Sequence, residues 1–378
     1  MTFFVRALTL LVLLLPSAGM AQVPSAPELA ARGYILMDHH SGKVLASKNE
    51  QQQLDPASIT KLMSAYAAFR ALADGQIKLD DQVPVSEQAW RTPGSRMFIE
   101  VNTRVTVQEL LQGMIVQSGN DASVALAEYI AGTEAVFAQL MTQYARELGM
   151  NNTTYKNSTG LPAEGHQTTA ADIARLATVI IEEFPQYYAW YSQREFTYNG
   201  ITQKNRNALL WRDPSVDGMK TGMTDAAGYC LVSSAKRDGM RLIAVVLGTK
   251  SPTARANDSQ ALLNYGFRFF ETRLLYAAGD EIKDAEVKVW KGEQEKTGLG
   301  TLKDLYVTIP RGAYDRLEAQ LDLPQQVVAP VEPSEQLGVL RVSLADQTLA
   351  EANLFALNAV PQGSIWQRAR DSVLLWFE

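Results

Sequence analysis

The stretch PASITKLMSAYAAF (residues 56–69) places Ser58 and Lys61 three positions apart at the start of an apolar helix. In a helix, side chains at this spacing lie on the same face, about one turn from each other. A serine that opens a helix is usually a cap, and a helical lysine is usually solvated, so the pair alone is weak evidence for a catalytic site. A second such pair, Ser233 and Lys236, falls where a strand is expected to run into a turn, which would not hold the two side chains together.

Two further motifs strengthen the first one. SGN (residues 118–120) lies between two expected helices, and KTG (residues 220–222) lies just before the expected strand YCLVSS. Each has an ordinary alternative: a helix end followed by a helix start for SGN, and a turn into a strand for KTG. Because all three motifs occur in this order, each in the expected secondary structure, the combination favours a shared site over coincidence.

The three motifs resemble the S-x-x-K, S-x-N and K-T-G elements of the penicillin-recognising serine enzymes. Within that group the chain is most similar to the low-molecular-mass penicillin-binding D-alanyl-D-alanine carboxypeptidases of the peptidase S11 type, in the segments SGNDASVALAEYIAG, DGMKTGMT and LLNYGFRFFET. The resemblance covers essentially the whole mature chain. It implies an α+β catalytic domain with the penicillin-binding-protein and β-lactamase transpeptidase fold, a small sandwich-like all-β domain, and a membrane-anchoring amphipathic helix at the C-terminus.

The same resemblance implies the activity. The protein is expected to be a serine D-alanyl-D-alanine carboxypeptidase that removes the terminal D-alanine from peptidoglycan pentapeptide stems through an acyl-enzyme on Ser58. Its partners would be the peptidoglycan stem peptide, β-lactam antibiotics as covalent inhibitors, and the inner-membrane surface.

The expected catalytic group starts from the need to activate a serine hydroxyl, since no histidine is placed to do so. Lys61 is expected to be the base, because burial and the neighbouring cation Lys220 both lower a lysine pKa. Ser118 would pass a proton to the departing amine, and the Asn120 amide would hold the substrate carbonyl. Lys220 is expected to stay charged as an electrostatic anchor.

The expected substrate contacts lie on the KTG segment and on a helix that follows it. Thr221, Gly222 and Met223 would bind substrate, with the N–H groups of Ser58 and Met223 forming the oxyanion hole. Relatives often have histidine where this chain has Met223, a difference that preserves a backbone role but not a side-chain role. Arg255, in ARANDSQALLNYGF, stands where the resemblance places a guanidinium for the substrate carboxylate; the alternative is a solvated arginine at a helix end.

The first 21 residues have the features of a cleaved secretory signal. One basic residue, Arg6, precedes an apolar run from Ala7 to Leu15, and a small-residue stretch ends at Ala21. The run is short for a bilayer span, so the mature chain is expected to begin at Gln22. Together with the resemblance, this predicts export to the periplasmic face of the inner membrane.

The last segment, residues 361–378, predicts an amphipathic helix. Its apolar face consists of Ile365, Trp366, Ala369, Val373, Trp376 and Phe377. Such a helix suits the membrane surface, with the tryptophan rings at the interface. The alternative is a terminal helix packed on the body of the protein. Pro361 and Gly363 predict a flexible hinge before it.

Composition narrows the remaining function classes. The chain has 378 residues, 46% of them hydrophobic, and a net charge of −6, which indicates a globular protein of two domains and argues against nucleic acid as a partner. Cys230 is the only cysteine, which excludes an internal disulfide, and its context AGYCLVSS predicts a buried strand residue. His39, His40 and His166 form no helical metal-ligand pair, so no metal or cofactor is predicted.

Residues 22–279 predict one α+β domain. The pattern gives a hairpin at 33–47, helices at 58–73, 107–117, 122–131, 134–148 and 169–183, a second hairpin around Arg237-Asp238-Gly239, and a closing helix at 258–270. A sheet with strands from both ends of the domain and a helical block between them is an α+β arrangement. Residues 280–360 predict an all-β domain from the alternating segments AEVKVW, LYVTIP and LGVLRVSL.

Two other functions compete with this interpretation. A class A β-lactamase would use a glutamate in an E-x-x-L-N segment, and the nearest segment here, ELGMN (residues 147–151), is typical of a helix end. A non-catalytic cell-wall-binding or shape protein on the same fold would not need the complete set of motifs. His166 and Asp172 are weaker site candidates, and Asp172 is more typical of a first helical turn. TPGSRMF (residues 92–98) is interpreted as a loop at the cleft edge, with no role assigned.

Overall fold

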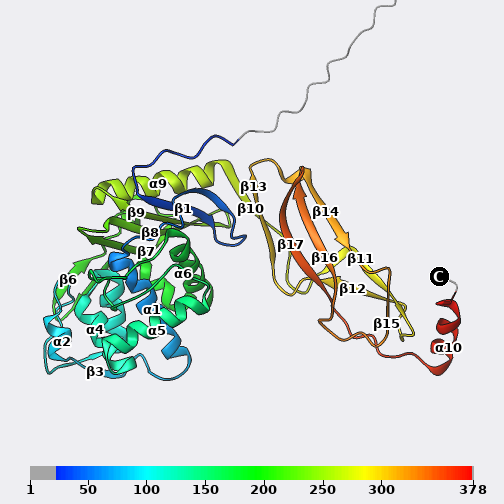
Figure 1. The fold of residues 1–378 in the computed structure, drawn as a ribbon, viewed down its shortest axis with the longest axis horizontal. Coiled ribbons are helices and arrows are strands. Elements are labelled where there is room, and N and C mark those ends of the chain that lie inside the picture. The colour runs from blue at the N-terminus through cyan, green and yellow to red at the C-terminus, as the bar shows by residue number, and fades with distance from the viewer. Residues whose placement is uncertain (1–22, 377–378) are drawn as a thin grey trace, which may run out of the picture.

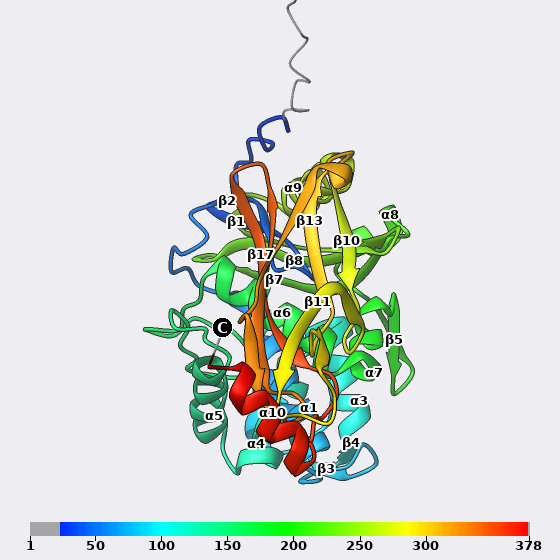
Figure 2. The ribbon, with the colours of Figure 1, turned by 90° about the vertical axis from the view of Figure 1, so that its right-hand side faces the viewer.

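The computed structural model describes residues 23–376, so the predicted signal segment lies outside the described residues. A mixed α and β domain is followed by a β domain that lies beside it (Figure 1). The last helix lies at the end of the β domain that is remote from the first domain, as two perpendicular views show (Figures 1 and 2).

The first domain is built on a five-stranded antiparallel sheet with the order β2-β1-β9-β8-β7. Its strands are β1 (Gly33–Asp38), β2 (Val44–Lys48), β7 (Val216–Thr224), β8 (Gly228–Arg237) and β9 (Met240–Thr249). Strands from both ends of the domain therefore share one sheet, which confirms the α+β prediction. The continuous apolar run in β9 is explained by burial on both faces, since Leu242 through Leu247 are fully buried.

Helices cover both faces of this sheet (Figure 1). On one side lies α9 (Pro252–Phe269), whose Leu262 and Leu263 pack on the sheet. The other side carries the helical block: α1 (Lys61–Ala73), α4 (Asn120–Ala131), α5 (Glu134–Glu147) and α6 (Ala170–Glu183). Almost every residue of α1 is buried, which is why its sequence lacks a polar face.

Shorter elements surround this block. They are η1 (Ala57–Thr60), β3 (Gln82–Pro84), α2 (Glu87–Arg91), β4 (Arg104–Thr106), α3 (Val107–Gln112), η2 (Gly113–Gln117), α7 (Pro185–Tyr188), η3 (Ala189–Ser192), β5 (Glu195–Tyr198), β6 (Ile201–Lys204) and α8 (Leu209–Arg212). The helix expected at 107–117 is thus an α-helix that ends in a π-helical turn. KTG, expected just before a strand, lies inside β7.

The second domain contains a six-stranded sheet, β14-β16-β17-β12-β11-β15, and a separate pair, β10-β13. Its elements are β10 (Phe270–Tyr276), β11 (Glu281–Trp290), β12 (Lys296–Gly300), β13 (Leu305–Pro310), η4 (Tyr314–Arg316), β14 (Leu317–Asp322), β15 (Gln326–Val328), β16 (Gln336–Leu344) and β17 (Gln347–Ala356). Ile309 of β13 shares one buried cluster with Leu340 and Leu354 of the large sheet, so the two layers pack face to face. The boundary expected at Gly279 falls after β10, whose partner is β13.

Several polar contacts join the two domains. Thr272 Oγ1 donates to Asp38 Oδ2 at 2.7 Å, and Ser41 Oγ lies 2.6 Å from Thr308 Oγ1. The ring of His40 stacks on Tyr306 with a centroid separation of 4.6 Å. The β1–β2 turn of the first domain is therefore held by β10 and β13 of the second.

The terminal helix α10 (Ile365–Leu374) packs on the β domain by its polar side. Asp371 is buried, and its Oδ2 accepts the Lys291 N–H at 2.7 Å. Gly363 N–H donates to Lys291 O at 2.8 Å, so the segment predicted to be a flexible hinge is hydrogen-bonded to the β domain. The apolar side points to solvent, with Trp366 85% and Trp376 91% exposed; Phe377 lies outside the described residues. No described helix has the length and apolar character that a membrane span requires.

Candidate active site

Ser58 and Lys61 meet at the start of α1. Ser58 lies in the 3₁₀ turn η1 and Lys61 is the first residue of α1, so the chain itself places them one turn apart. Lys61 Nζ lies 3.1 Å from Ser58 Oγ, and the Lys61 side chain is only 1% exposed. Burial, followed by the charge of Arg206, lowers the pKa of Lys61 to about 7. An amine with this pKa is able to accept the serine proton near neutral pH.

Two further contacts orient the Lys61 amine. Its Nζ donates to Asn120 Oδ1 at 2.7 Å and to the backbone oxygen of Thr159 at 2.6 Å. A neutral amine has two hydrogens and one lone pair. When these two shorter hydrogen bonds use the hydrogens, the lone pair is left for the hydroxyl of Ser58.

Ser118 ends the π-helical turn η2, Asn120 begins α4, and both line the same cleft. Ser118 has a left-handed backbone with φ of 69°, an unusual conformation for a residue with a side chain. Its hydroxyl is buried and has no hydrogen-bond partner among the described residues. A buried hydroxyl without a partner is expected to have a functional explanation, and a reacting group in the cleft would supply one.

Lys220 is a buried residue of β7, 3% exposed, and lies next to the cleft-lining residues Thr221 and Gly222 without lining the cleft itself. Its Nζ donates to Thr221 O at 3.0 Å. Burial and then the charge of Lys61 lower the pKa of Lys220 well below its usual range. Burial therefore argues against the permanent charge that the sequence analysis gives to Lys220.

Two arginines make the cleft electropositive. Arg255, near the start of α9, lines the cleft and donates from Nη1 to the Gly222 carbonyl at 3.1 Å. Arg206 also lines the cleft, and its charge acts on both Lys61 and Lys220. Arg206 is not predicted from the sequence, because it lies in the irregular segment QKNRNALL, which carries no motif.

Two glycines allow the backbone segments of the site to approach each other. A Cβ on Gly222 would lie 3.1 Å from Pro56 O, so β7 packs directly against the turn that carries Ser58. A Cβ on Gly160 would lie 1.8 Å from Ala57 O, and Gly160 has a left-handed φ of 85°. The loop that supplies the Thr159 carbonyl thus requires glycine at position 160.

The cleft between these elements has a volume of about 470 Å³. Its lining includes Ser58, Ser118 and Asn120 from the helical side and Thr221 through Thr224 from β7. Gly94 and Ser95, from the segment interpreted as a cleft-edge loop, complete one wall. Met223 is 51% exposed, so its side chain is open to solvent at this cleft.

His166 and Asp172, the weaker site candidates, are engaged in hydrogen bonds within the protein. His166 Nδ1 accepts the Lys156 N–H at 3.0 Å, which leaves Nε2 to donate to Thr60 Oγ1 at 2.8 Å. Asp172, in the first turn of α6, accepts from Thr153 Oγ1 at 2.6 Å. Neither is among the described residues that line the cleft.

The ELGMN segment and the second serine–lysine pair also lie outside the site. Glu147 is the exposed last residue of α5, as expected for a helix end rather than a catalytic glutamate. Ser233 is buried in β8 with its hydroxyl directed to Ala244 O, and Lys236 is exposed. Cys230 is a buried strand residue, as predicted.

Comparison with known proteins identifies both domains. A family model described as D-alanyl-D-alanine carboxypeptidase matches residues 20–251, and one described as the C-terminal domain of penicillin-binding protein 5 matches residues 270–362. The D-alanyl-D-alanine carboxypeptidase DacC of Escherichia coli (strain K12) is 42% identical over 376 residues, covering 97% of this chain and 94% of that protein.

Solved structures agree with this result. Penicillin binding protein 5 from Haemophilus influenzae matches with a TM-score of 0.85 and 39% identity, covering 90% of this chain and 100% of that one. Penicillin-binding protein D2 from Listeria monocytogenes, solved in an ampicillin-bound form, matches with a TM-score of 0.60 and 28% identity, covering 65% of this chain and 100% of that one. With its fold, its motifs and these relatives, the chain belongs to the D-alanyl-D-alanine carboxypeptidase family of serine hydrolases.

Proposed function

We propose that this carboxypeptidase removes the terminal D-alanine of peptidoglycan pentapeptide stems through an acyl-enzyme on Ser58. The observation that carries the proposal is the 3.1 Å contact between Ser58 Oγ and the buried amine of Lys61. Ser58 Oγ attacks the carbonyl carbon of the penultimate D-alanine, the peptide C–N bond breaks, and the terminal D-alanine leaves. Water then hydrolyses the ester and frees Ser58. A β-lactam would acylate the same oxygen, which the ampicillin-bound relative supports.

The proton path follows from the contacts of Lys61. Its lone pair takes the proton of Ser58. That proton is then relayed to the departing amine through Ser118, whose hydroxyl has no partner in the described part of the chain, so Lys61 and Ser118 end the step as they began it. Asn120 Nδ2 has two hydrogens, of which one is donated to Pro93 O at 2.6 Å and the other is available to a substrate carbonyl. The N–H groups of Ser58 and Met223 serve as the oxyanion hole.

The substrate carboxylate is expected to bind against β7 and the two arginines. Thr221 supplies a hydroxyl and Gly222 allows close backbone approach, while Arg206 and Arg255 supply positive charge. A carboxylate beside Lys220 favours the charged form of that lysine and opposes the effect of burial. We therefore propose that Lys220 acts as a cation once substrate is bound.

The location of the enzyme forms a second part of the proposal. Trp366 and Val373 of α10, with Trp376 just beyond it, would enter the headgroup region of the inner membrane, while the buried Asp371 holds the helix on the β domain. With a cleaved signal in residues 1–21, the enzyme would lie on the periplasmic face. In this arrangement the β domain lies between the first domain and α10 (Figure 1).

Incubation of the purified protein with a peptide that ends in D-alanyl-D-alanine, followed by assay of free D-alanine, tests the activity. Ser58→Ala should abolish both D-alanine release and covalent labelling by a fluorescent penicillin, because the acyl bond is to this oxygen. Ser233→Ala, in the buried second pair, should leave labelling intact. Undiminished labelling of Ser58→Ala would refute the assignment. Persistent label would separate this enzyme from a β-lactamase, which releases it quickly.

A further inference from the structure

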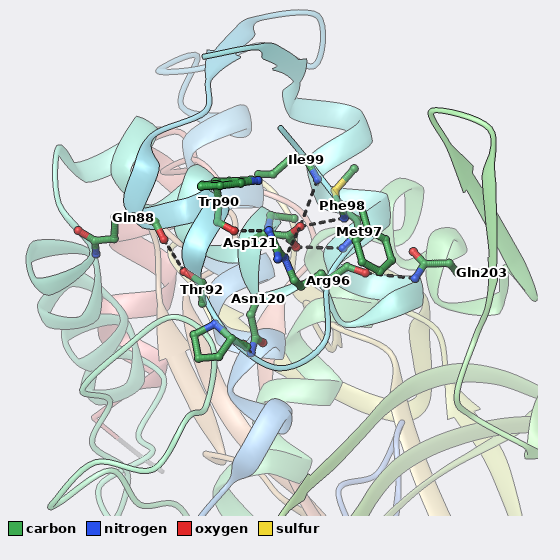
Figure 3. A network of polar contacts seen from close by, with 12 residues as sticks. Gln88, Trp90, Thr92, Arg96, Met97, Phe98, Ile99, Asn120, Asp121 and Gln203 are labelled. Carbon is green, nitrogen blue, oxygen red and sulfur yellow. Dashed lines mark hydrogen bonds and ion pairs between the residues drawn. The ribbon is translucent and has the colours of Figure 1, made fainter. Parts of the chain in front are cut away.

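Asp121, directly after Asn120, holds the segment 93–99, here called the wall loop. Its side chain is fully buried. Oδ1 accepts the Met97 N–H at 3.0 Å, and Oδ2 accepts the N–H groups of Phe98 at 2.9 Å and Ile99 at 3.3 Å. Figure 3 shows these backbone amides converging on the one carboxylate.

This arrangement requires an unusual backbone. In an extended chain successive N–H groups point in opposite directions, so they converge on one anion only when the chain leaves that conformation, for example in a turn or where a left-handed residue follows a right-handed one. Phe98 does so, with φ of 70°, which is unfavourable for a residue with a bulky side chain. The charge of Asp121 offsets that strain by giving each of the three N–H groups an ionised acceptor.

The wall loop in turn fixes the side chain of Asn120. Ser95 O accepts the Asn120 N–H at 2.7 Å, and Pro93 O accepts from Asn120 Nδ2 at 2.6 Å. Because Nδ2 is committed to Pro93, Oδ1 must point the other way, toward Lys61 Nζ at 2.7 Å. If the loop moved away, the amide could rotate and present a donor to Lys61 in place of an acceptor.

We propose that Asp121 is a positioning residue for acylation: by clamping the wall loop, it holds the Asn120 amide in the orientation that directs the Lys61 amine at Ser58. Asp121 touches no reacting atom and positions Asn120 through Pro93 and Ser95. Its charge also raises the pKa of Lys61, so loss of that charge alone would favour the neutral amine and would not slow acylation. The inference rests on the roles proposed above for Ser58, Lys61 and Asn120. It also gives the TPGSRMF segment a function in the reaction.

The test is the substitution Asp121→Asn in the full chain, studied with a fluorescent penicillin. An amide keeps the size of the carboxylate, but one of its two ends becomes an NH₂ donor that faces backbone donors, so part of the clamp is lost. A purely structural role would lower the labelling end-point, which counts folded sites, and leave the first-order rate constant of the folded fraction unchanged. We expect the reverse: a full end-point with a rate constant reduced about tenfold or more.

Asp213→Asn is the matched control. Asp213 is also a buried carboxylate that holds a loop, through the Ser215 N–H at 2.9 Å and Gln260 Nε2 at 2.8 Å, but these partners do not line the cleft. Asp213→Asn should label with the rate constant of the unsubstituted protein, even if its labelling end-point is lower. An unaltered rate constant in Asp121→Asn at full end-point would overturn the inference.

A second variant decides the matter if Asp121→Asn does not fold. A Cβ on Gly94 would lie 2.7 Å from Asn120 Nδ2, so Gly94→Ala pushes the wall loop off the amide without touching the clamp. Slow labelling of Gly94→Ala at full end-point supports the inference, and labelling at the rate of the unchanged protein overturns it. Failure of the proposed function itself would appear differently, as absence of Ser58-dependent labelling in the unchanged protein.

Discussion

Lys61 and Lys220 are both buried behind the residues that line the cleft, yet the proposed reaction needs one neutral and the other charged. An arginine cannot be deprotonated at working pH, so Lys61→Arg should lose nearly all D-alanine release. Lys220→Arg should keep a measurable part of it, because a cation facing the substrate carboxylate is what that role requires. The measurement is kcat on a D-alanyl-D-alanine peptide for each variant. Equal losses of kcat would contradict the assignment of a neutral Lys61 and a charged Lys220. The comparison is needed because burial lowers the pKa of Lys220 as well, so its charge cannot be assumed.

The rate of acylation should depend on pH through Lys61. Below its pKa of about 7 the amine is protonated and cannot accept the serine proton, so the acylation rate constant should fall about tenfold for each pH unit below that value and level off above it. His166, which contacts Thr60 beside Lys61, has its pKa lowered to about 4 by burial and would not produce this profile. Stopped-flow acylation across the neutral range checks the expectation, and a flat profile contradicts it.

Site residues could be predicted where they lie in a short sequence motif. Ser58 and Lys61 are one helical turn apart in the chain, so their contact follows from local geometry. Arg206 could not be found in this way, because an irregular segment brings it to the cleft and nothing in its neighbours indicates that path. Asp121 could not be found in this way either, because its contacts are with a loop more than 20 residues away in sequence.

Among the elements, the loop around Gly160 should be the most sensitive to a small substitution. Gly160→Ala would place a methyl group 1.8 Å from Ala57 O, which forces the Ser58 turn or the loop to shift. Overpacking of this kind destabilises by about 1–3 kcal/mol, and here it should also slow penicillin labelling because it moves the Thr159 carbonyl from Lys61. Thermal unfolding and labelling rate are the two measurements.

Gly75→Ala is the matched control for that substitution. Gly75 has a similar left-handed φ of 70°, but a Cβ there would meet nothing within 4 Å. It should therefore show the backbone penalty alone, with an unchanged labelling rate. If both glycine variants behave alike, the close approach at Gly160 is not what constrains the site.

The helices were predicted better than some of the strands, for a physical reason. Long apolar or amphipathic runs such as those of α1 and α6 form helices that are stable only when their apolar residues are buried in the core, so the pattern alone predicts the element. The strand β7 has a mixed sequence, VDGMKTGMT, and is held by its pairing with β8, which no local pattern reports. The β5–β6 hairpin was missed although Asn199-Gly200 is a strong hairpin signal, and both residues have positive φ.

For the whole molecule, α10 should determine where the enzyme is found. A chain that ends at Val360 keeps the bridge between Val331 and Val360 and should be folded, soluble and active on small peptides. The full chain should partition with membranes and require detergent for release. High salt alone should release it poorly. Salt screens the attraction between charges, but it does not remove the about 1.5–3 kcal/mol of binding free energy that each buried large apolar side chain contributes. Membrane fractionation of both forms is the measurement.

A point variant separates membrane docking from simple packing of the terminal helix. Trp366 and Val373 are 85% and 61% exposed, so Trp366→Glu with Val373→Glu should leave the fold and the peptide activity unchanged. The same pair should move the protein to the soluble fraction. A full-length, unsubstituted protein that remains soluble without detergent would refute docking.

The joint between the domains has a consequence for which stems the enzyme reaches. The β1–β2 turn is tied to β10 and β13 by Asp38, Ser41 and His40, and α10 is tied to the far end of the β domain by Asp371. Contacts at both ends of the β domain oppose bending between the domains and at α10, so a membrane-docked enzyme would hold its cleft at a fixed distance from the lipid surface. Stems would then be selected by their depth in the wall as well as by their chemistry, and lengthening the β domain would shift the trimmed layer outward without any change in the cleft.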